Sequence, residues 1–327
     1  MIRARSIVAV LFVASLFAGC GSSDSPPPLF SILPADETGV TFINEVEDTV
    51  DRHVLNFPYI YNGGGVAAGD VNGDGRPDLY FTANMGANKL YLNQGEFRFE
   101  DVTDAAGVRD EVGWTTGVTM ADVNGDGRLD IYVCKAGNIG DEHRRNKLYI
   151  NNGDGTFTDR AAEYGLDASA YSVHASFLDF DRDGDLDMYL LNNPPIRDSR
   201  VSVQPTLQQR RMFSDDQLFR NDTDAEGGPR FVDVTEEAGL KQEVLGYGLS
   251  ATVSDINHDG WPDIYVANDY GPEDRLYLNQ GDGTFTDAIH EWIDHMPRSS
   301  MGADIADIDN DGWADVYVLD MLPEDNY

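Results

Sequence analysis

The segment Asp70–Tyr80, DVNGDGRPDLY, decides how the rest of this sequence is interpreted. Its first nine residues contain three aspartates, one asparagine and two glycines, and an apolar run follows. Carboxylates placed this close together repel one another unless solvent or a cation separates their charges. A solvated polar turn would need no particular spacing, because Asp, Asn and Gly are all common in turns. A cation would need oxygen ligands at the positions of a coordination shell.

The same frame, D-x-D/N-x-D-G-x-x-D, occurs five times in the chain. Its copies start at Asp70, Asp122, Asp179, Asp255 and Asp307, with separations of 52, 57, 76 and 52 residues. A second motif follows the first four copies, and NKLYLNQGEFRFEDVTDAAGV from Asn88 and NKLYINNGDGTFTDRAAEYGL from Asn146 are its clearest forms. Two motifs that recur together in the same order define a repeat of about fifty residues.

Each repeat contains short apolar runs that are rich in β-branched and aromatic residues and are separated by glycine-containing turns. In the first repeat we expect four strands, near residues 64–69, 79–83, 89–92 and 97–102. The first of them consists of small residues, as in GGGVAAG, which suits crowding around an axis. The pattern predicts an all-β fold, a β-propeller of four-stranded blades, of which about five of seven blades are present.

The stretches before the first repeat and after the last one fit incomplete units. Residues 29–42, LFSILPADETGVTF, loosely match the fourth strand and exit turn of the other units, as in FEDVTDAAGV. They are therefore expected to complete a late blade and to help close the ring. Tyr327 lies only seven residues beyond the second predicted strand of the fifth unit, which predicts an incomplete last blade.

The shared frame fits a calcium ion better than a plain turn. Oxygen side chains at positions one, three and five, a backbone carbonyl at position seven and a glycine at position six are what a short calcium loop requires. The predicted side-chain ligands are Asp70, Asn72, Asp74 and Asp78; Asp122, Asn124, Asp126 and Asp130; Asp179, Asp181, Asp183 and Asp187; Asp255, Asn257, Asp259 and Asp263; Asp307, Asp309, Asp311 and Asp315. The predicted carbonyl ligands belong to Arg76, Arg128, Asp185, Trp261 and Trp313. The sequence thus predicts about five Ca²⁺ ions.

EF-hands and magnesium sites are alternatives that the residues disfavour. An EF-hand would place a bidentate Glu at position twelve, whereas position twelve is apolar here and falls in a predicted strand. Magnesium prefers a tight octahedron that keeps several waters. The loops are therefore predicted to be calcium-binding β-hairpin loops, and an ordinary polar turn remains the alternative for any single one of them.

The aspartate loops, together with the motif N-K/R-L-Y-x-N-x-G-D-G-x-F, resemble the FG-GAP/VCBS repeats of integrin-type propellers. The stretch GGGVAAGDVNGDGRPDLYF, followed by NKLYLNQG and DVTDAAGV, is especially similar to the cartilage acidic protein family, also called ASPIC/UnbV proteins. The resemblance covers residues 38–327. It implies a calcium-loaded propeller at the cell surface that serves in adhesion or ligand binding. The family usually adds a C-terminal ASPIC/UnbV domain, which these 327 residues do not include.

The first residues predict export and a lipid anchor. MIRARSIVAVLFVASLFAGC has two arginines, an apolar run from Ile7 to Ala18 that is too short to span a bilayer, and small residues before Cys20. LFAGC resembles a bacterial lipobox, whose cysteine carries the lipid, and a plain secretory signal is the alternative. We expect a signal peptide at residues 1–19, the lipidated Cys20 and a flexible tether at 20–37, and the repeats at 38–327. The expected location is the outer membrane or cell surface of a bacterium.

Charge excludes several classes of partner. The chain has 23 Lys and Arg against 58 Asp and Glu, a formal net charge of -35, and such a chain repels nucleic acid and anionic lipid. Contact with a membrane is therefore expected only through the lipid anchor. The expected partner is a protein or a glycan, anionic ligands included. Apart from Cys20 the only cysteine is Cys134, so no disulfide framework is predicted.

The alternative function is that of a propeller scaffold in a carbohydrate-active enzyme, such as a polysaccharide lyase. HEWIDH, from His290 to His295, is the nearest approach to a zinc motif, but histidines five apart on a helix point about 140° away from each other. No G-x-S-x-G, P-loop or C-x-x-C-H motif occurs in the sequence. We therefore predict a non-enzymatic module and assign no catalytic residue.

Long connections between the second and third strands mark a candidate ligand site. The second and third units carry the insertions AGNIGDEHRR and NNPPIRDSRVSVQPTLQQRRMFSD, which should emerge on the face opposite the calcium hairpins. The candidate ligand-binding residues in them are Arg144, Arg145, Arg197, Arg200, Arg210 and Arg211. A cationic patch on an acidic body would attract acidic glycans or a partner's carboxylates. Alternatively, these arginines merely pair with neighbouring acids.

Several other conspicuous residues are predicted to be structural. A tyrosine follows every loop by two residues, and core packing explains it because a blade buries both of its faces. Cys134 lies in a predicted strand and is expected to be a small buried apolar residue. His174 replaces the Gly or Ser of the other units and is expected to project toward the central channel.

Overall fold

The computed structural model describes residues 29–50, 52–55, 57–137, 140–193, 215–222, 228, 230–240, 246–269 and 273–321. The predicted signal peptide, Cys20 and the first part of the predicted tether lie outside these residues and stay predictions. The same holds for four of the six candidate ligand-binding arginines, Arg197, Arg200, Arg210 and Arg211.

The described strands form five antiparallel sheets, which we call blades 1 to 5. Blade 1 contains β1 (Val66–Gly69), β2 (Asp78–Phe81), β3 (Lys89–Gly95) and β4 (Arg98–Asp101), and blade 2 contains β5 (Trp114–Ala121), β6 (Asp130–Ala136), β7 (Lys147–Asn151) and β8 (Phe157–Asp159). Blade 3 contains β9 (Ser172–Leu178), β10 (Asp187–Asn192), β11 (Gln217–Asn221) and β12 (Phe231–Asp233). Blade 4 contains β13 (Gly248–Ser254), β14 (Asp263–Asn268), β15 (Arg275–Asn279) and β16 (Phe285–Asp287), and blade 5 contains β17 (Ser300–Ala306) and β18 (Asp315–Asp320).

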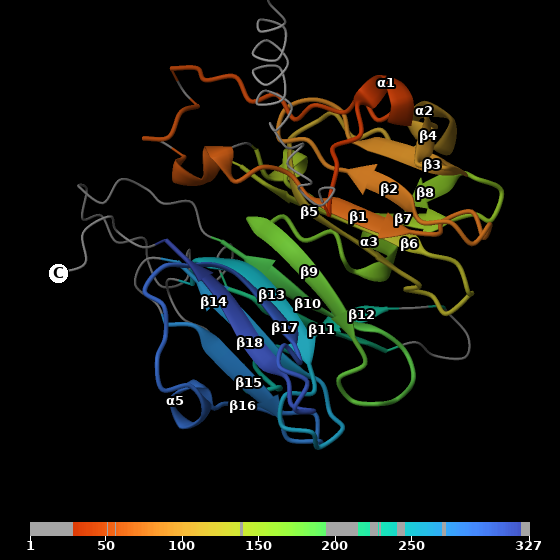
Figure 1. Ribbon diagram of the computed structural model, residues 1–327. Helices are drawn as coiled ribbons and strands as arrows, with labels where there is room; N and C mark the ends of the chain where they lie inside the picture. The colour runs from red at the N-terminus through yellow and green to blue at the C-terminus, as the bar shows by residue number, and fades with distance from the viewer. Residues whose placement is uncertain are drawn as a thin grey trace, which may run out of the picture.

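The blades follow one another around an axis, as Figure 1 shows. Their first strands are neighbours in chain order, because β1 contacts β5, β5 contacts β9, β9 contacts β13 and β13 contacts β17. Within each four-stranded blade the strands pair in sequence order, so that every blade is a meander with its first strand nearest the axis. The all-β, incomplete β-propeller predicted from the repeats is therefore confirmed, and the strands expected in the first unit match β1 to β4 within a few residues.

Short helices occupy connections between blades, the segment ahead of β1 and the connection between β6 and β7 in blade 2. They are α1 (Ala35–Thr38), α2 (Thr103–Ala106), α3 (Ala161–Tyr164) and α5 (Ile289–Trp292), with the 3₁₀ helices η1 (Pro58–Tyr61) and η2 (Asp141–His143). None of the helices in the described part of the chain combines the length and the apolar composition needed to cross a bilayer.

The second strand of each four-stranded blade forms the core. All residues of β6, β10 and β14 are buried, because neighbouring blades cover both faces of these strands. The predicted tyrosines Tyr80, Tyr132, Tyr189 and Tyr265 are at most 1% exposed, and Cys134 is fully buried, as expected. Burial raises the pKa of the Cys134 thiol far above its usual value. In blade 5 the equivalent Tyr317 is 57% exposed, since β18 pairs only with β17 among the described strands.

The exit turns of blades 1 to 3, and the similar turn ahead of β1, contain a glycine with positive φ, whereas the exit turn of blade 4 ends at Ile293. Gly39, Gly107, Gly165 and Gly239 have φ between 74° and 79°, a region that favours glycine. A Cβ on Gly165 would lie 2.9 Å from the carbonyl oxygen of Phe231 in the fourth strand of the following blade. Gly107 and Gly239 lie against Phe157 and Phe285 in the same way, and Gly39 lies against Phe99. Residues 35–39 therefore repeat the exit turn of a blade, as the sequence match indicated, whereas residues 29–34, expected to match a fourth strand, are not in a strand.

Candidate functional site

The five aspartate loops connect the first strand of each blade to its second strand. They span residues 70–77, 122–129, 179–186, 255–262 and 307–314, at one end of the sheets. The glycine at position six of the frame has a positive φ in every loop, between 82° and 100°. A side chain at this position would be strained, which explains why the frame requires glycine there.

The aspartate at position nine fastens each loop to the body of its blade. In blade 2, Asp130 is fully buried, and its Oδ2 accepts the N–H of Val123 at 3.1 Å. Its Oδ1 accepts the N–H of Asn151 in β7 at 2.8 Å. Asp78, Asp187 and Asp263 make the same pair of bonds in their blades. One carboxylate thus holds the loop and the third strand together.

The aspartate at position one organises the loop backbone. Asp70 Oδ1 accepts the N–H groups of Gly73 and Asp74, at 2.8 and 3.1 Å, and its Oδ2 accepts that of Gly75 at 2.7 Å. The bond from Gly75 is the main reason why the pKa of Asp70 is lowered. The side chains at positions one and nine therefore already point into the loop.

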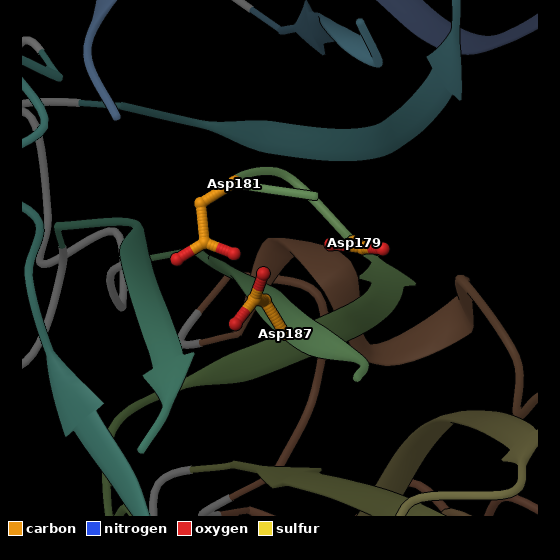
Figure 2. Close-up of side chains that lie close together, drawn as sticks. All are labelled: Asp179, Asp181 and Asp187. Atoms are coloured by element: carbon orange, nitrogen blue, oxygen red, sulfur yellow. The ribbon is translucent and has the colours of Figure 1, made fainter. Parts of the chain in front are cut away.

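In blade 3 three carboxylates of the loop converge. Oxygen atoms of Asp179, Asp181 and Asp187, at positions one, three and nine, lie within 4.8 Å of one another, and Figure 2 shows these side chains where β9 leads into β10. The equivalent oxygens of Asp307, Asp309 and Asp315 in blade 5 are grouped in the same way. The other three blades carry asparagine at position three. Converging carboxylate and amide oxygens are the ligands that calcium prefers.

Uncompensated negative charge distinguishes the blade 3 loop. Asp179 Oδ1 and Asp185 Oδ1 are buried and have no hydrogen-bond partner among the described residues. Burial, followed by the nearby carboxylates, raises the pKa of Asp185 to about 6, and burial is the main cause that raises the pKa of Asp187 to about 7. A cation in this loop would satisfy the unpaired oxygens and reverse these shifts, so the residues present fit a calcium ion.

Asp185 is a candidate ligand that sequence reasoning described only in part. The frame assigned its backbone carbonyl, at position seven, to the ion. The structure places its carboxylate among the other acids of the loop, since Asp183 contributes to its raised pKa. Position seven is Arg or Trp in the other four loops, so the acidic residue there is the sequence signal for an additional carboxylate in this loop, a signal that the frame alone did not use.

The residue at position seven also separates the other four loops into two types. In blades 1 and 2 an arginine pairs with the carboxylate at position five, and Arg76 Nη2 and Arg128 Nη2 lie 2.5 Å from Asp74 and Asp126. In blades 4 and 5 a tryptophan receives a side chain from the preceding loop: Arg182 lies over the Trp261 ring, and His258 stacks on Trp313. Neighbouring loops of blades 3 to 5 are therefore in direct contact.

Of the candidate ligand-binding arginines the structure describes Arg144 and Arg145, which follow β6 on the face opposite the aspartate loops, and both are paired. Arg144 is 4% exposed, contacts Asp141 and lies over the Tyr171 ring, 4.4 Å from its centroid. Arg145 is more exposed and lies 2.5 Å from Asp167. The pairing with acids that we considered as the alternative therefore describes these two arginines. Whether the six arginines bind a ligand stays a prediction.

The HEWIDH segment does not form a helical histidine pair. α5 ends at Trp292, so His295 lies outside it. His290 is largely exposed, and its Nε2 lies 3.0 Å from Glu273 Oε2.

Comparison with known proteins identifies the repeats. The model of a family described as FG-GAP-like repeat matches residues 70–133, 138–190 and 255–318, together more than half of the chain. Cartilage acidic protein 1 from Homo sapiens is 28% identical over 245 residues, and that from Mus musculus is 28% identical over 242 residues. The matches cover 74% of this chain and 33% and 34% of these relatives, so the chain spans about a third of their length.

A solved structure is also similar. It is titled "Structural basis of specific recognition of non-reducing terminal N-acetylglucosamine by an Agrocybe aegerita lection" and is 19% identical, with a TM-score of 0.41. The match covers 77% of this chain and 59% of that one. The resemblance to FG-GAP repeats and to cartilage acidic protein, inferred from the loops and the NKLYLNQG and DVTDAAGV motifs, is confirmed by the family match and the curated relatives. The chain belongs to the family of FG-GAP-like repeat proteins and is a propeller of the integrin type.

Proposed function

We propose that this protein is a calcium-binding, cell-surface propeller that acts as an adhesion or ligand-binding module. The observation that carries the calcium assignment is the blade 3 loop, where three carboxylates converge and two buried oxygens lack partners. Five loops in one frame extend the assignment to about five ions. Export and attachment through Cys20, on the outer membrane or cell surface, follow from the predicted lipobox.

Calcium would act in this protein as a structural ion. Positions one, three, five and nine would supply side-chain oxygens, and position seven would supply its carbonyl. Because the aspartate at position nine also binds the third strand, an ion in the loop would reinforce three strands of one blade. Asp187 shows the arrangement, since it accepts N–H bonds from Phe180 and Asn221.

Thermal unfolding with calcium and with a chelator tests the assignment. A site occupied at one hundred times its Kd adds about 2.7 kcal/mol to stability, so even one or two such sites should raise Tm clearly. Asp187→Asn should reduce the calcium effect, whereas Asp104→Asn, on a side chain that is 77% exposed and outside the loops, should not. Superimposable curves with calcium and chelator would refute calcium binding.

The lipid anchor has a separate test. A labelled fatty acid should be incorporated into the wild-type protein and not into Cys20→Ser. Equal labelling of the two proteins would remove the lipoprotein assignment and leave the calcium proposal untouched.

A further inference from the structure

A pocket of about 470 Å³ lies on the propeller axis, at the end of the inner strands that is opposite the aspartate loops. Every blade contributes to it near the start of its first strand, through residues that include Gly64, Thr116, His174, Ser250 and Met301. The segment ahead of β1 covers it with further side chains. Its volume is in the range that small-molecule sites occupy.

The described lining of this pocket is aromatic and uncharged. Phe57, Trp114 and Tyr171 provide ring surfaces, and Phe57 and Trp114 meet edge to face with centroids 5.3 Å apart. No Asp, Glu, Lys or Arg is among the described lining residues, although the chain carries a net charge of -35. The one imidazole in the lining is that of His174, and burial lowers its pKa, which favours the uncharged form. The pocket therefore disfavours ions of either sign.

One buried polar atom in the lining, Asn193 Oδ1, lacks a hydrogen-bond partner among the described residues, whereas Nδ2 of the same side chain donates to Gly248 O at 3.4 Å. Asn193 is 7% exposed. The equivalent residue of blade 1, Asn84, accepts a bond from Asn44 Nδ2 at 2.8 Å, and that of blade 4, Asp269, accepts one from the Tyr59 hydroxyl at 3.3 Å. The segment ahead of β1 thus supplies a donor to blades 1 and 4. At Asn193 a donor is still required, because an unmade bond at a buried acceptor is costly.

We infer that this pocket binds a neutral pyranose, such as the end unit of a glycan. A pyranose ring is uncharged, places its C–H groups against aromatic rings, and carries hydroxyl donors at its edge. One hydroxyl would donate to Asn193 Oδ1. The Thr116 hydroxyl already donates to Ser172 O at 2.7 Å, and so could accept a bond from a second sugar hydroxyl. This inference rests on the proposed ligand-binding function and names its ligand class and its site.

The test uses saturation-transfer NMR and calorimetric titration of the whole protein with methyl glycosides of glucose, galactose, mannose and N-acetylglucosamine. Methyl glucuronide serves as the negatively charged control ligand of the same ring size. We expect at least one neutral glycoside to bind with a millimolar or tighter Kd, and the glucuronide to bind at least tenfold more weakly. Asn193→Ala should weaken binding about tenfold to a hundredfold, which is the usual effect of losing a buried hydrogen bond.

Asn152→Ala is the matched control, because Asn152 is an exposed amide in the hairpin between β7 and β8, at the other end of the sheet from the pocket. It should bind the glycoside as the wild type does. If Asn193→Ala does not fold, Ser250→Phe, which fills the pocket from β13, should abolish binding. The inference is overturned if no neutral glycoside binds, if the glucuronide binds best, or if the pocket variant that folds binds normally. Thermal unfolding of the same samples with calcium and with a chelator shows whether the calcium proposal holds even if no glycoside binds.

Discussion

Replacing Asp216 by asparagine should remove a defined part of the pH dependence of stability. Asp216 precedes β11, where its Oδ1 accepts the N–H of Asn192 and its Oδ2 accepts the hydroxyl of Tyr189, both at 2.8 Å. Burial outweighs these two bonds and raises the pKa of Asp216 to about 7, and the neighbouring Asp215 adds to the shift. Blades 1 and 2 carry asparagine at the equivalent position, as Asn88 and Asn146.

The sign follows from the raised pKa. The folded protein prefers the protonated carboxyl, so the stabilisation is complete below the unfolded pKa near 4 and is lost as pH rises through about 7. A shift of about three pKa units corresponds to at most about 4 kcal/mol. Asparagine cannot ionise and therefore avoids this loss. At pH 8 Asp216→Asn should be more stable than the wild type by up to about 4 kcal/mol, and the difference should vanish near pH 4.

Blade 2 shows how an asparagine can be accommodated. Asn146 Nδ2 donates to the Tyr132 hydroxyl at 3.0 Å, and that hydroxyl donates to the carbonyl of Leu166. In the Asp216→Asn variant, the new amide would donate to the Tyr189 hydroxyl. That hydroxyl would then donate to a backbone carbonyl, as the Tyr132 hydroxyl does, so that no buried group loses a partner.

Denaturant unfolding of both proteins from pH 4 to pH 8, at one fixed calcium concentration, measures the effect. The difference between the two free energies matters, because other carboxylates titrate equally in both proteins. Asp104→Asn, which removes an exposed carboxylate, should give a flat difference. The reasoning fails if the Asp216→Asn difference is also flat, or if the variant becomes less stable as pH rises.

Three further experiments test the packing. Gly117→Ala should destabilise the folded protein by about 1–3 kcal/mol, since its Cβ would lie 2.3 Å from a backbone carbonyl oxygen. In the control, Gly302→Ala of blade 5, the Cβ meets nothing within 4 Å, so this variant should be tolerated. Equal losses of stability in chemical denaturation would contradict this prediction. Lys135→Met should cost about 3–5 kcal/mol, because Lys135 pairs with buried Asp110 at 2.7 Å, and an unchanged unfolding midpoint would refute it. The Cys134 thiol should react with a thiol reagent only after denaturation, and rapid labelling of the native protein would disprove its burial.

The repeat and its strands could be predicted from the sequence because the same pattern occurs independently in each unit. Five copies of the aspartate frame fixed the positions of the loops, and the alternation of apolar runs and glycine turns fixed four strands per unit. The buried tyrosines followed from the same reasoning. Tyr317 differs because its burial depends on a third strand, and none is described beside β18. The local sequence pattern thus predicted the strand that carries Tyr317, whereas the strands beside it determine how much of the tyrosine is exposed.

Contacts between units were harder to predict, because they depend on side chains that vary from repeat to repeat. Nothing in the spacing indicated that Arg144 would be buried against Tyr171, or that His258 would stack on Trp313 in the next loop. The missing donor at Asn193 is visible only beside its satisfied equivalent, Asn84. The sequence thus predicts which residue type stands at each position of a unit. The side chain that it contacts in a neighbouring unit can be identified only from the folded structure.

The exit-turn glycines have a consequence for the way the molecule comes apart. Each of them places one blade on the fourth strand of the next, so that a blade depends mainly on its immediate neighbours, as in a one-dimensional array. Blade 5 has a neighbour on one side only among the described strands, and it exposes Trp313, Tyr317 and Leu319. Opening of one blade should therefore affect mainly the blades beside it, so that amide hydrogen exchange differs from blade to blade instead of following one all-or-none transition.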